Sequence, residues 1–125
     1  MKILVVDDMS SMRNVMVHML INLGYNQTDE ASSGLQALKM LRLDNYELLI
    51  TDLHMPNLDG EQLLRKVRGD KKLHNLPVLM VSSEDDKVKI MQLIEGDVTG
   101  FMVKPFNLNT LKKQINWIRN NINVA

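Results

Sequence analysis

The chain alternates between short apolar runs and segments in which apolar residues recur with helical spacing. The strongest runs are rich in β-branched residues and lie at Ile3–Val6, Leu48–Ile50, Val78–Val81 and Phe101–Val103. Runs of this kind are typical of strands that are buried on both faces of a parallel sheet. A mostly polar segment, 26–31, is predicted to be an edge strand.

Between these runs, apolar residues recur at the three- and four-residue intervals of a helix face. The pattern predicts a helix after each strand. Ser10 or Ser11 is expected to cap the first helix, and Gly24 to end it in the left-handed conformation. The residues that mark the helices and their expected core faces are, in chain order, Met12, Val15, Met16, Met19, Leu20, Leu23, Leu35, Leu38, Leu41, Leu63, Leu64, Val67, Val88, Met91, Leu108, Leu111, Ile115, Ile118 and Ile122.

This alternation predicts an α/β fold in which helices cover both faces of a parallel sheet. A flavodoxin-like (βα)5 arrangement, a doubly wound parallel sheet with strand order 2-1-3-4-5, suits the length of 125 residues. The length also corresponds to one domain, so we expect residues 1–125 to form a single domain with nothing beyond it.

Composition narrows the classes of function. The chain has no cysteine, which excludes disulfide frameworks, thiolate metal sites and cysteine nucleophiles. Its 15 Lys and Arg residues balance 15 Asp and Glu residues, which argues against non-specific nucleic-acid binding. No apolar run could span a bilayer, and the first residues do not resemble a signal peptide. We therefore expect a cytoplasmic protein that binds neither nucleic acid nor membranes.

Polar residues stand directly after the predicted strands. Asp7 and Asp8 follow the first strand, Asp52 the third, Ser82 the fourth and Lys104 the fifth. The carboxyl ends of parallel strands meet at one edge of the sheet, and ligands bind there at the switch in strand order. Because this switch lies between the first and third strands, it is expected to bring the three aspartates together.

Three carboxylates in one crevice repel one another unless their pKa values rise or a cation is bound. Oxygen ligands without histidine or cysteine favour Mg²⁺. The simpler alternatives are that Asp7 or Asp8 caps the first helix, that Ser82 bonds to nearby backbone and that Lys104 is a surface lysine. Taken together, a carboxylate nucleophile, a metal, a hydroxyl and a lysine are the parts needed to accept a phosphoryl group.

Four motifs contain these residues, namely KILVVDD at 2–8, LLITDLHMPNLDG at 48–60, PVLMVSSE at 77–84 and GFMVKPF at 100–106. With them the sequence resembles the receiver domain of bacterial two-component response regulators over its whole length, and in particular the single-domain chemotaxis regulators of the CheY type. The resemblance implies a phosphoacceptor that takes part in its own phosphorylation and dephosphorylation, rather than an enzyme, and that receives its phosphoryl group from a sensor histidine kinase.

The resemblance also assigns roles to individual residues. Asp52 would accept the phosphoryl group from a phosphohistidine. Asp8 and Asp52 would bind Mg²⁺ directly, together with the backbone carbonyl of His54, whereas Asp7 would act through a metal-bound water. Ser82 would hydrogen-bond the phosphoryl group and Lys104 would pair with it. The family also places a cis peptide bond at 104–105.

Four residues depart from the pattern of the family. His54 stands where Asn is frequent, Ser82 where Thr is more common, Phe101 where CheY-type regulators have Tyr, and Asp97 where Gly is usual. The helical wheel places Trp117 outside the core stripe, and it leaves Ile90 and Ile94 as spare apolar surface. Together with Phe101 these residues are predicted to form an apolar output face on the fourth helix, fifth strand and fifth helix, with Lys87 and Lys112 at its rim.

The expected output is contact with a downstream protein, for which the flagellar motor switch is one candidate, from a monomer or a weak phosphorylation-dependent dimer. Other interpretations stay open, namely a receiver that serves as a phosphate sink and a receiver fragment of a longer regulator. A flavodoxin-like nucleotide-binding module is more remote, because the segment 7–11 lacks a phosphate-binding glycine. A haloacid-dehalogenase-type phosphatase would need its second aspartate two residues after the nucleophile, where Met9 stands.

Overall fold

The computed structural model describes residues 1–83 and 87–122. Its centre is a parallel sheet with the strand order β2-β1-β3-β4-β5, which confirms the predicted topology. The order places β1 and β3 side by side, and the chain reverses its direction of winding between them. The strands are β1 (Lys2–Val6), β2 (Gln27–Ala31), β3 (Leu48–Asp52), β4 (Val78–Ser82) and β5 (Gly100–Val103).

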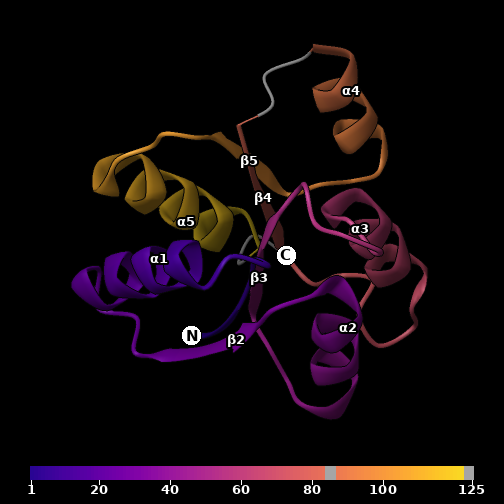
Figure 1. Cartoon of the computed structure of the whole chain (residues 1–125), viewed down its shortest axis with the longest axis horizontal. Coiled ribbons are helices and arrows are strands. Elements are labelled where there is room, and N and C mark those ends of the chain that lie inside the picture. Colours follow the sequence, from indigo (N-terminus) through magenta and orange to yellow (C-terminus); the bar gives the residue numbers. More distant parts are fainter. Residues whose placement is uncertain (84–86, 123–125) are drawn as a thin grey trace.

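Helices cover both faces of the sheet, as Figure 1 shows, with α1 and α5 on one face and α2, α3 and α4 on the other. This is the doubly wound arrangement that the alternation of strands and helices predicts. The helices are α1 (Ser10–Asn22), α2 (Gly34–Leu43), α3 (Gly60–Gly69), α4 (Lys87–Glu95) and α5 (Leu108–Ile122).

The hydrophobic core is divided by the sheet into two clusters, because successive strand residues point to opposite faces. Leu4 and Leu49 belong to the cluster beneath α2 and α3, whereas Ile3 and Ile50 belong to the cluster beneath α1 and α5. The inner strands are therefore apolar on both faces, while β2 at the edge is polar and buries only its last residue, Ala31. This contrast is the one that the sequence predicts.

Several details of the predicted helices are wrong. Neither Ser10 nor Ser11 caps α1, since the N-cap is Met9, which makes no side-chain capping bond. Gly24 does adopt a positive φ of 93° after the helix, as predicted. Five residues expected to face the core have large exposed fractions, and the side chain of Ile122 lies outside the described part of the chain. The five are Val15 (47%), Leu35 (61%), Val88 (65%), Met91 (61%) and Leu108 (38%).

No helix within 1–83 and 87–122 combines the length and the apolar character that crossing a membrane requires.

Candidate functional site

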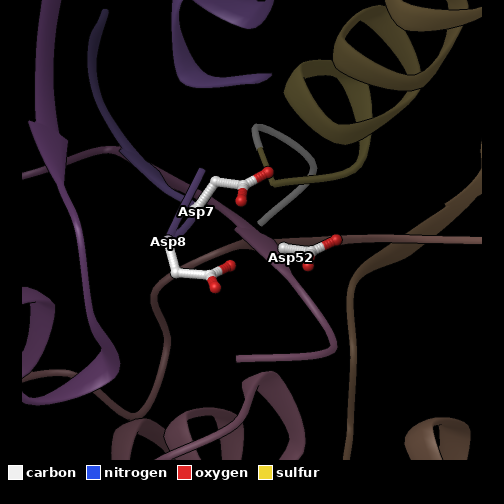
Figure 2. A group of neighbouring side chains, drawn as sticks. All are labelled: Asp7, Asp8 and Asp52. Atoms are coloured by element: carbon white, nitrogen blue, oxygen red, sulfur yellow. The ribbon is translucent and has the colours of Figure 1, made fainter. Parts of the chain in front are cut away.

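Three carboxylates converge at the carboxyl edge of the sheet. Asp7 and Asp8 follow β1 directly, and Asp52 is the last residue of the neighbouring strand β3. One oxygen from each carboxylate lies within 4.8 Å of the others (Figure 2). The structure thus brings together the three aspartates that the strand order predicts, at a spacing at which one small cation could bind them all.

The environments of these aspartates differ. Asp7 is only 7% exposed, and its Oδ1 accepts a hydrogen bond of 2.9 Å from the backbone N–H of Met9. Burial raises the pKa of the Asp7 carboxyl, and the negative charge of Asp52 adds to the effect, while the Met9 N–H opposes it. Asp8 is exposed to solvent. The site is therefore electrostatically strained without a cation, and open on one side for a cation to enter.

Lys104 closes the buried side of the cluster. Its Nζ lies 2.9 Å from Oδ1 of Asp52 and 3.7 Å from Oδ2 of Asp7. The lysine stands at the end of β5, and a cis peptide bond joins it to Pro105, as the resemblance implied. Its backbone N–H donates a 2.8 Å bond to the carbonyl oxygen of Ser82, which holds the ends of β4 and β5 together.

Ser82 and His54 flank this cluster along the chain. Ser82 is fully buried as the last residue of β4, directly after Val81, which pairs with Asp52 in the sheet. His54 is exposed and lies two residues beyond Asp52. The Ser82 hydroxyl thus lies at the end of β4, next to the end of β3 that carries Asp52. His54 lies on the segment that follows β3.

Two residues that sequence analysis did not single out hold the backbone of the site. A guanidinium nitrogen of Arg13 donates a 2.7 Å bond to the carbonyl oxygen of Asp7, and Nε donates to Glu30 at 3.2 Å. Gly60 packs against Asp52 so closely that an added Cβ would lie 2.4 Å from the Asp52 carbonyl oxygen. Neither role leaves a local sequence pattern, because each depends on backbone that is distant in the chain or on a close approach.

The residues of the predicted output face come together only in part. Phe101 and Trp117, the latter 53% exposed, line one shallow groove with Lys113. Ile90 is half-buried and Ile94 is 63% exposed, and both lie on α4 away from the lining of that groove. Lys87 and Lys112 are both exposed. The core contact of α4 comes from Leu93, not from the predicted pair Val88 and Met91.

Comparison with known proteins points to one family. A family model described as the response regulator receiver domain matches residues 3–116. The chain is 42% identical over 118 residues to the chemotaxis protein CheY-3 of Vibrio cholerae, covering 94% of this chain and 91% of that protein. It is 44% identical over 123 residues to the chemotaxis protein CheY of Pseudomonas aeruginosa, covering 98% and 99%.

Solved structures give the same result. The chemotaxis protein CheY4 of Vibrio cholerae superposes with a TM-score of 0.87 at 32% identity, covering 94% of this chain and 97% of that one. A signal receiver domain of a histidine kinase from Syntrophus aciditrophicus superposes with a TM-score of 0.89 at 27% identity, covering 99% and 93%.

Proposed function

The chain belongs to the response regulator receiver domain family, and we propose that it is a Mg²⁺-dependent phosphoacceptor switch in which Asp52 carries the phosphoryl group. The observation that carries the proposal is the position of Lys104, whose Nζ lies 2.9 Å from Asp52 at the edge where the three carboxylates meet. A lone ammonium beside a carboxylate at the end of a strand can neutralise and hold a new anionic group formed there.

In the proposed reaction, a carboxylate oxygen of Asp52 attacks the phosphorus of a phosphohistidine on a sensor kinase. The P–O bond to Asp52 forms as the P–N bond breaks, and the histidine, which carries a proton on its other ring nitrogen, leaves as neutral imidazole. The acyl phosphate brings about 1.5 to 2 negative charges to a site that already holds two other carboxylates. Lys104 pairs with the added charge, and the Ser82 hydroxyl donates a hydrogen bond to a phosphoryl oxygen.

The donor set fits Mg²⁺. It consists of hard carboxylate oxygens within 4.8 Å of one another, one of them exposed for entry, and contains no thiol. Asp8 and Asp52 would bind the ion directly with the backbone carbonyl of His54, and Asp7 would hold a bound water. When bound, the ion neutralises charge on the phosphoryl oxygens. Burial raises the pKa of the Asp7 carboxyl, so a cation nearby would stabilise its charged form.

The phosphorylated form would signal through the apolar output face, which comprises Ile90, Ile94, Phe101 and Trp117. Lys104 and Ser82 both move toward the new oxygens, and they stand at the ends of β5 and β4, which lead into that face. The relatives named above are chemotaxis proteins, so we propose a chemotaxis pathway in the cytoplasm. The flagellar motor switch is one candidate target. The protein would act as a monomer or a weak phosphorylation-dependent dimer.

The deciding experiment is phosphorylation of the Asp52→Asn variant by acetyl phosphate with Mg²⁺, followed by intact-mass spectrometry. We expect the wild type to gain one acid-labile phosphoryl group and the variant to gain none. Asp44→Asn is the matched control, because Asp44 lies at the end of α2 and pairs with Lys2, away from the cluster. Labelling of Asp52→Asn at the wild-type rate would overturn the proposal, as would labelling that chelation of Mg²⁺ leaves unchanged.

A further inference from the structure

A half-open cavity of about 540 Å³ lies beside the carboxylates, between α1, the sheet and the segment 104–106 that precedes α5. Its floor is formed by Val5, Ile50 and Val81, one residue from each of three neighbouring strands. Volumes of about 300 to 1,000 Å³ are typical of sites that enclose small organic molecules. The cavity is therefore large enough for a small organic ligand. A metal ion or a phosphoryl group would not fill it.

The walls of the cavity are apolar and adaptable. Met12, Met16 and Met19 line it from α1, and Phe106 lines it from the opposite side. Methionine side chains are flexible and polarisable, so they fit bodies of different shape and make favourable contacts with aromatic rings. Val15 stands at the outer rim and is 47% exposed. The walls thus favour an aromatic or branched aliphatic body.

One end of the cavity is polar and negatively charged. Asp7, Asp52 and Lys104 all line it, and the lysine Nζ lies 2.9 Å from Asp52 and 3.7 Å from Asp7. Asp7 is more than nine-tenths buried. Two carboxylates against one ammonium leave a negative charge at this end, and Asp8 in the same cluster adds to it. A charge of this kind in a partly dry site attracts a cationic group.

We propose that this cavity binds a small organic cation, a primary amine on an aromatic or branched aliphatic body. The ammonium group would contact Asp7 and Asp52 beside the Lys104 ammonium, whose single positive charge does not balance both carboxylates. The apolar body would lie against the methionines of α1 and the ring of Phe106. The two halves of the cavity together select this class. The net negative charge of the carboxylates would repel an anion, and a purely apolar molecule would leave the part of that charge that Lys104 does not balance uncompensated.

Binding does not depend on phosphorylation, but it would affect it. The ammonium group uses the two carboxylates that the proposed function assigns to phosphoryl and metal chemistry. If Asp52 is the phosphoacceptor, the ligand therefore lowers the rate of phosphorylation by competition. This consequence rests on the proposed function, whereas the binding itself does not, and the test below contains neither Mg²⁺ nor a phosphoryl donor.

The test titrates the full chain, labelled with 15N and at its methyl groups, with phenylbutylamine and follows the shifts of methyl groups and of the Trp117 indole N–H by NMR. Phenylbutanol and phenylbutyrate carry the same body with neutral and anionic heads. We expect the amine to bind about tenfold more tightly than the alcohol, and the carboxylate more weakly still. The largest shifts are expected at Val5, Ile50 and Val81. Equal affinities for the three compounds, or largest shifts at the Trp117 indole, would refute the proposal.

A matched pair of variants tests the apolar wall. Val15 and Ile21 lie on the same helix and are 47% and 51% exposed, but only Val15 lines the cavity. Val15→Gln is expected to weaken phenylbutylamine binding about fivefold, because it places a polar group against the bound body. Ile21→Gln should leave the affinity unchanged. Equal affinities of the two variants would show that the body lies elsewhere. Neither substitution adds charge, and both sites face solvent, so both variants are expected to fold.

Discussion

Helices α3 and α4 follow one another on the same face of the sheet, yet they are held there in different ways (Figure 1). Helix α3 buries Leu63, Leu64 and Val67 in the core beneath it. Helix α4 buries one residue, Leu93, and leaves three large apolar side chains largely exposed. Local stability follows the number of buried apolar contacts. Packing is therefore expected to hold α3 more firmly than α4.

The largest effect is expected from removing the buried leucines of the two helices. Leu64→Ala should lower the free energy of unfolding by about 2–5 kcal/mol, since it leaves a cavity in the core. Leu93→Ala should lower it less, because the loss is limited by the free energy needed to detach α4 locally. Urea denaturation measures both values, and hydrogen exchange should show lost protection confined to α4 in Leu93→Ala. If both variants lost the same free energy of unfolding, and α4 stayed protected from exchange in Leu93→Ala, the two helices would be held equally firmly.

The next effect concerns Arg68, which connects the end of α3 to the segment after α4. Its guanidinium donates to the carbonyl oxygens of Asp97 at 2.8 Å and Leu76 at 2.6 Å, and to the Thr99 hydroxyl at 3.2 Å. Arg68→Ala should cost about 1–3 kcal/mol of stability, because part-buried acceptors lose their donor. The control is Arg65→Ala on the same helix, which is expected to stay within about 0.5 kcal/mol of the wild type. A loss in both variants would point to charge rather than to these bonds.

The amino-terminal cap of α3 gives a smaller effect. Asp59 accepts a 2.8 Å bond from the N–H of Gln62, whose side chain accepts a 2.9 Å bond from the N–H of Asp59. Asp59→Ala should cost about 0.5–2 kcal/mol, and Asp59→Asn much less, since Asn is also a good cap. Thermal unfolding of the two variants measures the difference. If Asp59→Ala and Asp59→Asn lost the same stability, the charge of the Asp59 carboxylate would matter more than its hydrogen bond to Gln62.

The same two helices show what could be predicted from the sequence. The apolar residues of α3 recur with clear helical spacing, and its core residues Leu63, Leu64 and Val67 were predicted correctly. In α4, five of the seven residues from 88 to 94 are apolar, so no single stripe stands out, and the sequence favoured Val88 and Met91 over Leu93. Only the packing against the rest of the fold selects among them.

The candidate site was more predictable than α4, because strand order alone places the ends of β1 and β3 together. Asp7, Asp8 and Asp52 could therefore be grouped from three short runs of sequence. Arg13 of the site could not be predicted, and neither could Arg68 outside it, since each donates to a backbone carbonyl group of a residue beyond its own helix. Backbone acceptors have no residue type, so sequence patterns do not reveal such contacts.

The smallest effect on stability is expected from the ion pair that links the two helices. Nζ of Lys89 on α4 lies 2.9 Å from Oε1 of Glu61 on α3, and both side chains are partly buried. Lys89→Met should cost about 0.2–1 kcal/mol, as exposed and partly exposed pairs do, and salt should weaken the pair in the wild type. Lys66→Met, an exposed lysine of α3, is the control and should change nothing.

The effect of this pair on α4 itself should be larger than its effect on global stability. With one buried side chain, α4 depends on the ion pair to hold its first turn against α3, so Lys89→Met should speed hydrogen exchange throughout α4 and leave α3 unchanged. The reversed pair, Glu61→Lys with Lys89→Glu, should restore slow exchange, whereas each reversal alone should not. Unchanged exchange in Lys89→Met would mean that Leu93 alone holds the helix. In that case the contrast between α3 and α4 would lie entirely in their buried apolar contacts.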